Sequence, residues 1–247
     1  HEYMIYLPLY DGINWLQIGV DSTAQLLQPQ VENPRKMGKI VIYGTSIQQG
    51  GCASRTGMVP SAMIQRDFNL ECVNLATSGQ ARMDFYIAEA MASIEDAICY
   101  VIDPVPNCTK DRCDTATYDF INILRTLRPE VPIVMVEGLM YPYTRHDSYH
   151  AEYLPQKNEG FRRGYEQHLA ENPKGLYYMT CEGQTGPEME GTVDGVHLTD
   201  YGFRAYADLL EIHIKEALDD TDVDYDVEPA YNVVRKKTFW ERLKDLF

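Results

Sequence analysis

Between residues 39 and 218, short apolar runs alternate with longer amphipathic stretches, and this alternation constrains the fold more than any other feature of the chain. The apolar runs are nearly continuous and rich in β-branched residues, which is typical of strands buried on both faces of a parallel sheet. These runs are 39–43, 71–75, 98–102, 132–137 and 176–179. The intervening and following stretches have helical length and spacing: 58–69, 85–95, 115–127, 157–171 and 200–218. We therefore predict an α/β protein, a three-layer α/β/α sandwich around a five-stranded parallel sheet.

The helix limits follow from local signals. Apolar residues recur at helical spacing through 115–127, which gives this stretch one apolar face. Asp114 or Thr115 has a side chain suited to capping the start of this helix, and Pro129 stops it just beyond its end.

Two segments flank the alternating region. At the N-terminus, β-rich runs at 3–10 and 13–20 enclose the pair Asp11-Gly12, which is a signal for a β-hairpin. The stretch that follows contains two prolines and resembles a linker. We therefore divide the chain into a short β-hairpin segment with its linker (1–38) and an α/β domain (39–218), followed by a tail.

The tail comprises residues 219–247. Its first ten residues include six acidic ones, which repel one another and indicate a linker. Aromatic and leucine side chains then recur at helical spacing, which predicts a C-terminal amphipathic helix. We expect this helix to fold back onto the protein, with contact to a partner or a membrane as the alternative.

The charge balance limits the partners of the chain. Lys and Arg number 22 against 37 Asp and Glu, a formal net charge of −15. Nucleic-acid binding requires clustered basic residues, so we predict no nucleic-acid partner. No apolar run approaches the roughly 20 residues that a membrane-spanning helix needs. The charge leaves neutral or cationic partners open, a small-molecule or saccharide ester among them, and the sequence does not define the oligomeric state.

The six cysteines form no C-x-x-C pair, which argues against a zinc ribbon or a thioredoxin-type site. Cys108 and Cys113 share one polar loop and could pair in an oxidising compartment, or they could remain free thiols. His146, Asp147 and His150 cluster in sequence but lack a fourth ligand. We therefore predict no metal site.

Several residues with chemical potential follow the predicted strands. Ser46 comes directly after the first strand, Gly79 after the second and Asn107 after the third. Because parallel strands direct their carboxyl ends to one edge of the sheet, where ligands bind, all three should meet there. Asp194 and His197 precede the last helix and can form a hydrogen-bonded pair beside them. Each signal alone has an ordinary explanation, such as a helix cap for Ser46 or a turn for Gly79.

Taken together, these blocks resemble the SGNH (GDSL-like) hydrolase superfamily over about residues 39–218. The resemblance implies that Ser46 is the nucleophile, His197 the general base and Asp194 the residue that orients it. It also implies an oxyanion hole formed by the N–H groups of Ser46 and Gly79 and the side chain of Asn107, and a flavodoxin-like sheet. The first block has Thr45 where the family usually has aspartate. Cofactors are not implied.

Within the superfamily, the strings 44–57 and 192–197 resemble a bacterial branch that has a β-sandwich domain before the hydrolase domain. Residues 6–12 and 16–20 look like the end of that β-sandwich domain. Related two-domain proteins include carbohydrate esterases. The resemblance therefore implies a serine esterase that hydrolyses short acyl groups, acetyl above all, on carbohydrate.

Four further residues are candidates for substrate binding because they follow strand ends. They are Arg55, Arg82, Glu137 and Tyr141. The chain starts at His1 without a leader segment, from which we expect a processed product that is secreted or periplasmic. Two alternatives remain open: the same machinery acting on a lysophospholipid or a thioester, and a non-catalytic carbohydrate-binding protein that keeps the fold.

Overall fold

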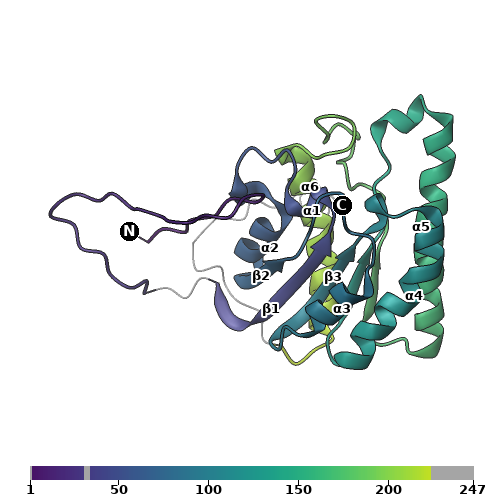
Figure 1. Ribbon diagram of the computed structural model, residues 1–247, viewed down its shortest axis with the longest axis horizontal. Coiled ribbons are helices and arrows are strands. Elements are labelled where there is room, and N and C mark those ends of the chain that lie inside the picture. The colour runs from purple at the N-terminus through teal and green to yellow at the C-terminus, as the bar shows by residue number, and fades with distance from the viewer. Residues whose placement is uncertain (1, 31–33, 224–247) are drawn as a thin grey trace, which may run out of the picture.

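The computed structural model describes residues 2–30 and 34–223 and contains a five-stranded sheet (Figure 1). Its strands are β1 (Arg35–Gly44), β2 (Leu70–Asn74), β3 (Ala97–Asp103), β4 (Ile133–Val136) and β5 (Leu176–Met179). Their order is β2-β1-β3-β4-β5, and every neighbouring pair is parallel. The predicted α/β architecture with a five-stranded parallel sheet is confirmed.

Helices cover both faces of the sheet. They are α1 (Ser46–Gln49), α2 (Pro60–Phe68), α3 (Phe85–Ala92), α4 (Lys110–Leu127), α5 (Ser148–Glu171) and α6 (Asp200–Asp219), with short 3-10 turns at Thr56–Met58, Val105–Asn107 and Pro142–Arg145. Figure 1 shows α2 and α6 on one side of the sheet and α3, α4 and α5 on the other. This arrangement is the three-layer sandwich that alternating strands and helices favour.

Strand β1, which lies between β2 and β3, separates two apolar cores. Ile40 and Ile42 pack into the core that contains the apolar residues of α2 and α6. Val41 and Tyr43 point the other way, into the core formed with α3 and α4. Successive strand residues face opposite sides of a sheet, so a strand covered on both faces must be apolar throughout. The absence of polar alternation in the sequence therefore has a direct structural cause.

Two helices begin earlier than their sequence patterns predict. α4 starts at Lys110 because the Thr109 hydroxyl accepts a hydrogen bond from the Arg112 N–H, at 3.1 Å. Thr115, one of the two residues predicted to cap this helix, instead donates its hydroxyl to a backbone carbonyl inside it. α5 is capped by Asp147 and accommodates a proline in its second turn. In both cases a side-chain acceptor before the predicted boundary supplies the cap.

The predicted N-terminal β-hairpin is absent from the structure: residues 2–30 contain no strand. Figure 1 shows them as an extended excursion from the body of the molecule. Carbonyl groups of Tyr6 and Leu9 accept hydrogen bonds from side chains of the α/β domain instead of from a partner strand. The expected linker also ends earlier than predicted, because β1 already begins at Arg35.

α6 ends at Asp219, and from residue 224 onward the predicted acidic linker and the predicted C-terminal helix lie outside the described residues. Cys108 and Cys113 are buried free thiols. Across the described part of the chain, no helix combines the length and apolarity needed to cross a membrane.

Candidate active site

Ser46 lies at the carboxyl end of β1, where the chain turns directly into α1. Thr45 caps this helix by accepting a hydrogen bond from the Ile47 N–H, and Ser46 is its first residue. Gly44 makes the turn possible: a side-chain carbon there would lie 2.5 Å from the Gln48 side chain. The first N–H of a helix has no carbonyl partner within the helix, so the Ser46 N–H is available as a donor.

The loop before α6 is held by unusually close backbone contacts. A side-chain carbon on Gly202 would lie 2.0 Å from the Gly191 carbonyl oxygen, so only glycine fits. Thr192 and Leu198 form an antiparallel bridge, and the Thr199 N–H donates to the Gly191 carbonyl at 2.9 Å. These contacts fix a short turn over residues 193–197 against the start of α6.

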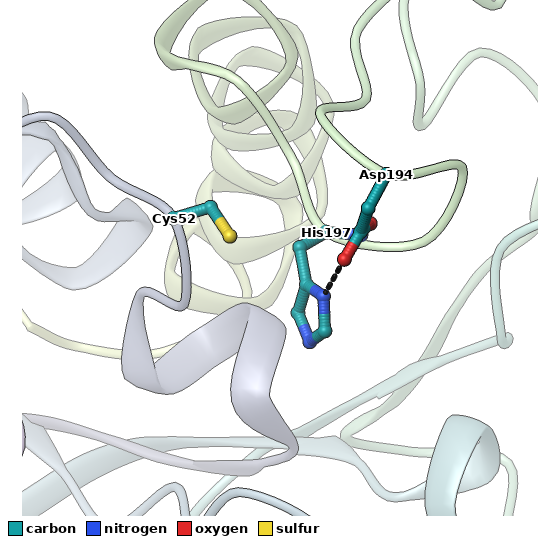
Figure 2. Close-up of side chains that lie close together, drawn as sticks. All are labelled: Cys52, Asp194 and His197. Atoms are coloured by element: carbon teal, nitrogen blue, oxygen red, sulfur yellow. Dashed lines mark hydrogen bonds and ion pairs between the residues drawn. The ribbon is translucent and has the colours of Figure 1, made fainter.

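This turn joins Asp194 and His197 to Ser46 in one chain of hydrogen bonds. The Ser46 Oγ lies 3.0 Å from His197 Nε2, and His197 Nδ1 lies 2.7 Å from Asp194 Oδ2 (Figure 2 shows the second contact). The other Asp194 oxygen accepts the N–H groups of Val196 and His197. The side-chain hydrogen bond to His197, followed by these backbone N–H groups, lowers the pKa of Asp194 to about 2. Asp194 therefore stays ionised and fixes which His197 nitrogen faces Ser46.

The Asn107 carboxamide is oriented by a neighbouring backbone group. Its Oδ1 accepts a hydrogen bond from the Ala81 N–H at 3.3 Å, which leaves the Nδ2 group as the free donor. Gly79 adopts a positive φ of 73°, and in the described part of the chain its N–H has no hydrogen-bond partner. The structure thus leaves three donors unengaged at this edge of the sheet: the Ser46 and Gly79 N–H groups and the Asn107 amide.

The two arginines that the sequence predicts to bind substrate are exposed. Arg55 reaches toward Asp200 at 3.9 Å and has a side chain that is 70% exposed. Arg82 donates to the Gly79 carbonyl at 3.2 Å, next to a candidate oxyanion donor. Both guanidinium groups are accessible, so their assignment to substrate binding stays a prediction.

The other two predicted contacts are buried. The Glu137 side chain is 1% exposed; it pairs with Arg162 and accepts hydrogen bonds from the Tyr178 hydroxyl and the Cys181 N–H. Both of its oxygens are engaged within the protein, so the structure gives Glu137 a structural role instead of the predicted substrate contact. Tyr141 is 6% exposed and stacks on Tyr143 with ring centroids 5.4 Å apart. Its burial raises the pKa of its phenol, which therefore stays protonated.

Cys52 adds a third potential metal ligand beside His197 and Asp194. Among the described residues, these three form the one group whose ligand atoms all lie within 4.8 Å of one another. Figure 2 shows the Cys52 thiol reaching toward His197 from the turn after α1. However, the two nitrogens of His197 already face Ser46 and Asp194. The arrangement is the one that proton transfer requires, and a metal ion would have to break it.

The sequence did not predict a buried polar network formed by Asp103, Tyr206 and Gln48. The Tyr206 hydroxyl lies 2.7 Å from Asp103 Oδ2 and accepts a hydrogen bond from Gln48 Nε2 at 2.8 Å. Burial raises the pKa of Asp103 to about 7, although the hydrogen bonds from Tyr206 and Gln48 oppose this shift. The available signal was the position of Asp103: it is a charged residue at the end of β3, whose other residues are apolar.

Comparisons with known proteins agree with this geometry. The model of the GDSL-like Lipase/Acylhydrolase family matches residues 37–215. The crystal structure of a GDSL-like lipase from Bacteroides ovatus superposes with a TM-score of 0.80 at 34% identity, covering 87% of this chain and 62% of that one. The chain thus spans less than two thirds of that relative. No curated protein sequence matches the chain.

Two more distant structures share the fold. The salicylyl-acyltransferase SsfX3 from a tetracycline biosynthetic pathway is 18% identical with a TM-score of 0.62, covering 76% of this chain and 56% of that one. A family two carbohydrate esterase from Clostridium thermocellum, solved with cellohexaose, is 17% identical with a TM-score of 0.58. That match covers 79% of this chain and 68% of the esterase.

Proposed function

Because the chain belongs to the GDSL-like lipase/acylhydrolase family, whose members act on ester bonds, we propose that it is a serine esterase that removes short acyl groups from a carbohydrate. The observation that supports this proposal most is the hydrogen-bonded chain from Ser46 through His197 to Asp194. A hydroxyl, an imidazole and a carboxylate in this order are the parts that acyl transfer through a serine requires.

In the proposed reaction, the Ser46 Oγ attacks the ester carbonyl while His197 Nε2 takes its proton. The negative charge that develops on the carbonyl oxygen is stabilised by the Ser46 and Gly79 N–H groups and the Asn107 amide. His197 then gives the proton to the leaving alcohol, and Ser46 keeps the acyl group. Water, activated by the same imidazole, attacks this acyl-enzyme and releases the acid.

Tyrosine side chains beside the Ser46–His197 pair support a carbohydrate substrate. A side-chain carbon on Gly195 would lie 3.2 Å from the Tyr143 ring, and one on Gly51 would lie 3.1 Å from the Tyr10 hydroxyl. Aromatic rings with a polar group suit the faces and hydroxyls of sugars. The likeness in fold to a family two carbohydrate esterase points the same way.

Steady-state hydrolysis of two ester series tests the proposal. One series is acetylated xylo-oligosaccharides, and the other is p-nitrophenyl esters of increasing acyl length. Wild-type protein and the Ser46→Ala variant are compared on both. We expect the acetyl esters to be hydrolysed fastest, and we expect Ser46→Ala to lower kcat by on the order of 10³-fold or more with the fold retained.

Three other results would each contradict a defined part of the proposal. A preference for long acyl chains would replace the carbohydrate substrate with a lipid one. Equal turnover by Ser46→Ala would remove Ser46 as the nucleophile. Sugar binding without turnover, unchanged in Ser46→Ala, would indicate a non-catalytic binding protein.

A further inference from the structure

The N-terminal strap, which we define as residues 6–10, packs against the segments that follow β1 although it lies outside the α/β domain. The Tyr6 hydroxyl lies 3.0 Å from Arg66 Nη1, and the guanidinium of Arg66 also covers the Tyr6 ring at 5.6 Å. The Tyr6 carbonyl accepts a hydrogen bond from the Thr56 hydroxyl at 3.4 Å. A cavity of about 130 Å³ lies between the strap and α2, and Tyr6, Leu7 and Leu9 of the strap line it.

Gln49 links the strap to the loop that carries Gly79. Its Nε2 donates to the Leu9 carbonyl at 3.2 Å, and its Oε1 accepts the Ser78 N–H at 2.7 Å. Ser78 directly precedes Gly79, a proposed oxyanion donor. One side chain at the end of α1 therefore fixes both the strap and one wall of the site.

Tyr10 ends the strap beside the proposed general base. A side-chain carbon on Gly51 would lie 3.1 Å from the Tyr10 hydroxyl and 3.2 Å from His197 Cδ2, so both groups flank the same glycine. Tyr10 is 53% exposed, and within the described part of the chain its hydroxyl has no hydrogen-bond partner. An accessible phenol with an unused donor and acceptor is thus held next to His197.

From this placement we infer that Tyr10 is a specificity-determining residue that binds the alcohol half of the ester substrate. The inference rests on the proposed function. His197 Nε2 must donate its proton to the leaving oxygen, so the alcohol leaves on the His197 side of the scissile bond. Cδ2, the His197 atom that flanks Gly51 together with the Tyr10 hydroxyl, is bonded to Nε2 in the ring. The phenol therefore suits a hydroxyl on the alcohol near the ester oxygen, as in a sugar or another polyol.

A matched pair of esters tests this role. 1-Monoacetin and propyl acetate share the acetyl group and differ in the hydroxyls of a three-carbon alcohol. We expect Tyr10→Phe to lower kcat/KM for monoacetin by about five- to tenfold, the effect of one neutral hydrogen bond, and to change it for propyl acetate by less than about twofold. Tyr3→Phe is the control because Tyr3, on the same N-terminal segment, is 84% exposed.

The ratio of kcat/KM for the two esters distinguishes recognition of the alcohol by Tyr10 from a structural role of this residue. If Tyr10→Phe lowers turnover of both esters equally, or of neither, Tyr10 does not recognise the alcohol and the inference is overturned. In that event the proposed function still stands, provided that Ser46→Ala abolishes turnover of both esters. If Ser46→Ala turns them over like the wild type, the proposed function fails, and the inference fails with it.

Discussion

Asn107 shows how one hydrogen bond assigns a function to a side chain. A carboxamide has an acceptor end and a donor end, and the Ala81 N–H engages the acceptor end. The donor end is therefore directed away from Ala81 without any contribution from substrate. Such preorganised donors stabilise a developing oxyanion strongly because the protein does not reorganise during the reaction.

Asn107→Asp is the sharpest test of this assignment. The variant keeps an oxygen acceptor for the Ala81 N–H but replaces the donor end with a second oxygen. We expect kcat to fall by on the order of 10²- to 10³-fold, because the oxyanion loses a donor and gains a repulsive neighbour. Steady-state kinetics and a thermal melt are the measurements. A kcat within about tenfold of the wild type would remove Asn107 from the oxyanion hole.

Individual residues differ in how well the sequence predicts their placement. Ser46, Gly79 and Asn107 follow three strands of one parallel sheet, and topology alone brings strand ends together. Glu137 also follows a strand, yet it is buried because Arg162 and Tyr178 neutralise and bind it. Those partners come from α5 and β5, and no sequence pattern near Glu137 predicts them.

At the scale of elements, the loop between β5 and α6 determines the geometry around His197. It contains no regular helix or strand, and its shape depends on the close approach of Gly191 to Gly202. The Asp-x-x-His motif is visible in sequence, but these glycine contacts are not. The N-terminal hairpin was predicted wrongly for the related reason that a D-G turn signal does not show whether two strands have room to pair.

Gly202→Ala tests the importance of this loop. The added methyl would lie 2.0 Å from the Gly191 carbonyl oxygen, so the backbone must move. Because a shift of about 1 Å at a reacting group can cost roughly 10²-fold in rate, we expect kcat to fall by more than about tenfold. Ile212→Ala is the control, since Ile212 is an exposed residue of the same helix, α6. Unchanged kcat in Gly202→Ala would show that the loop tolerates displacement.

At the scale of the whole molecule, the fold removes the carboxyl group of Asp103 from solvent. Asp103 is fully buried, and its Oδ1 has no hydrogen-bond partner among the described residues. Burial penalises the ionised form, which is why its folded pKa is about 7 against an ordinary value of 3.8. Burial therefore favours a neutral Asp103 carboxyl, although the hydrogen bonds from Tyr206 and Gln48 favour its ionised form.

The buried carboxyl of Asp103 makes the free energy of unfolding depend on pH. Between about pH 4 and pH 7, the unfolded chain releases the Asp103 proton while the folded protein keeps it, so the contribution of Asp103 to stability falls as pH rises and levels off above 7. The slope is at most about 1.4 kcal/mol per pH unit. Asp103→Asn, which mimics the neutral carboxyl, should gain stability relative to the wild type from pH 5 to pH 7. Urea unfolding across this range measures the difference, and a flat or declining difference would contradict the assignment.

Active-site labelling shows whether Ser46 is an activated nucleophile, on which every step of the proposed reaction depends. The protein is incubated with a serine-reactive alkyl phosphonate, and the modified peptide is identified by mass spectrometry. The account predicts stoichiometric modification at Ser46 and its loss in His197→Ala, since the imidazole 3.0 Å from the hydroxyl must remove its proton. Labelling elsewhere, or labelling of Ser46 that survives His197→Ala undiminished, would contradict it.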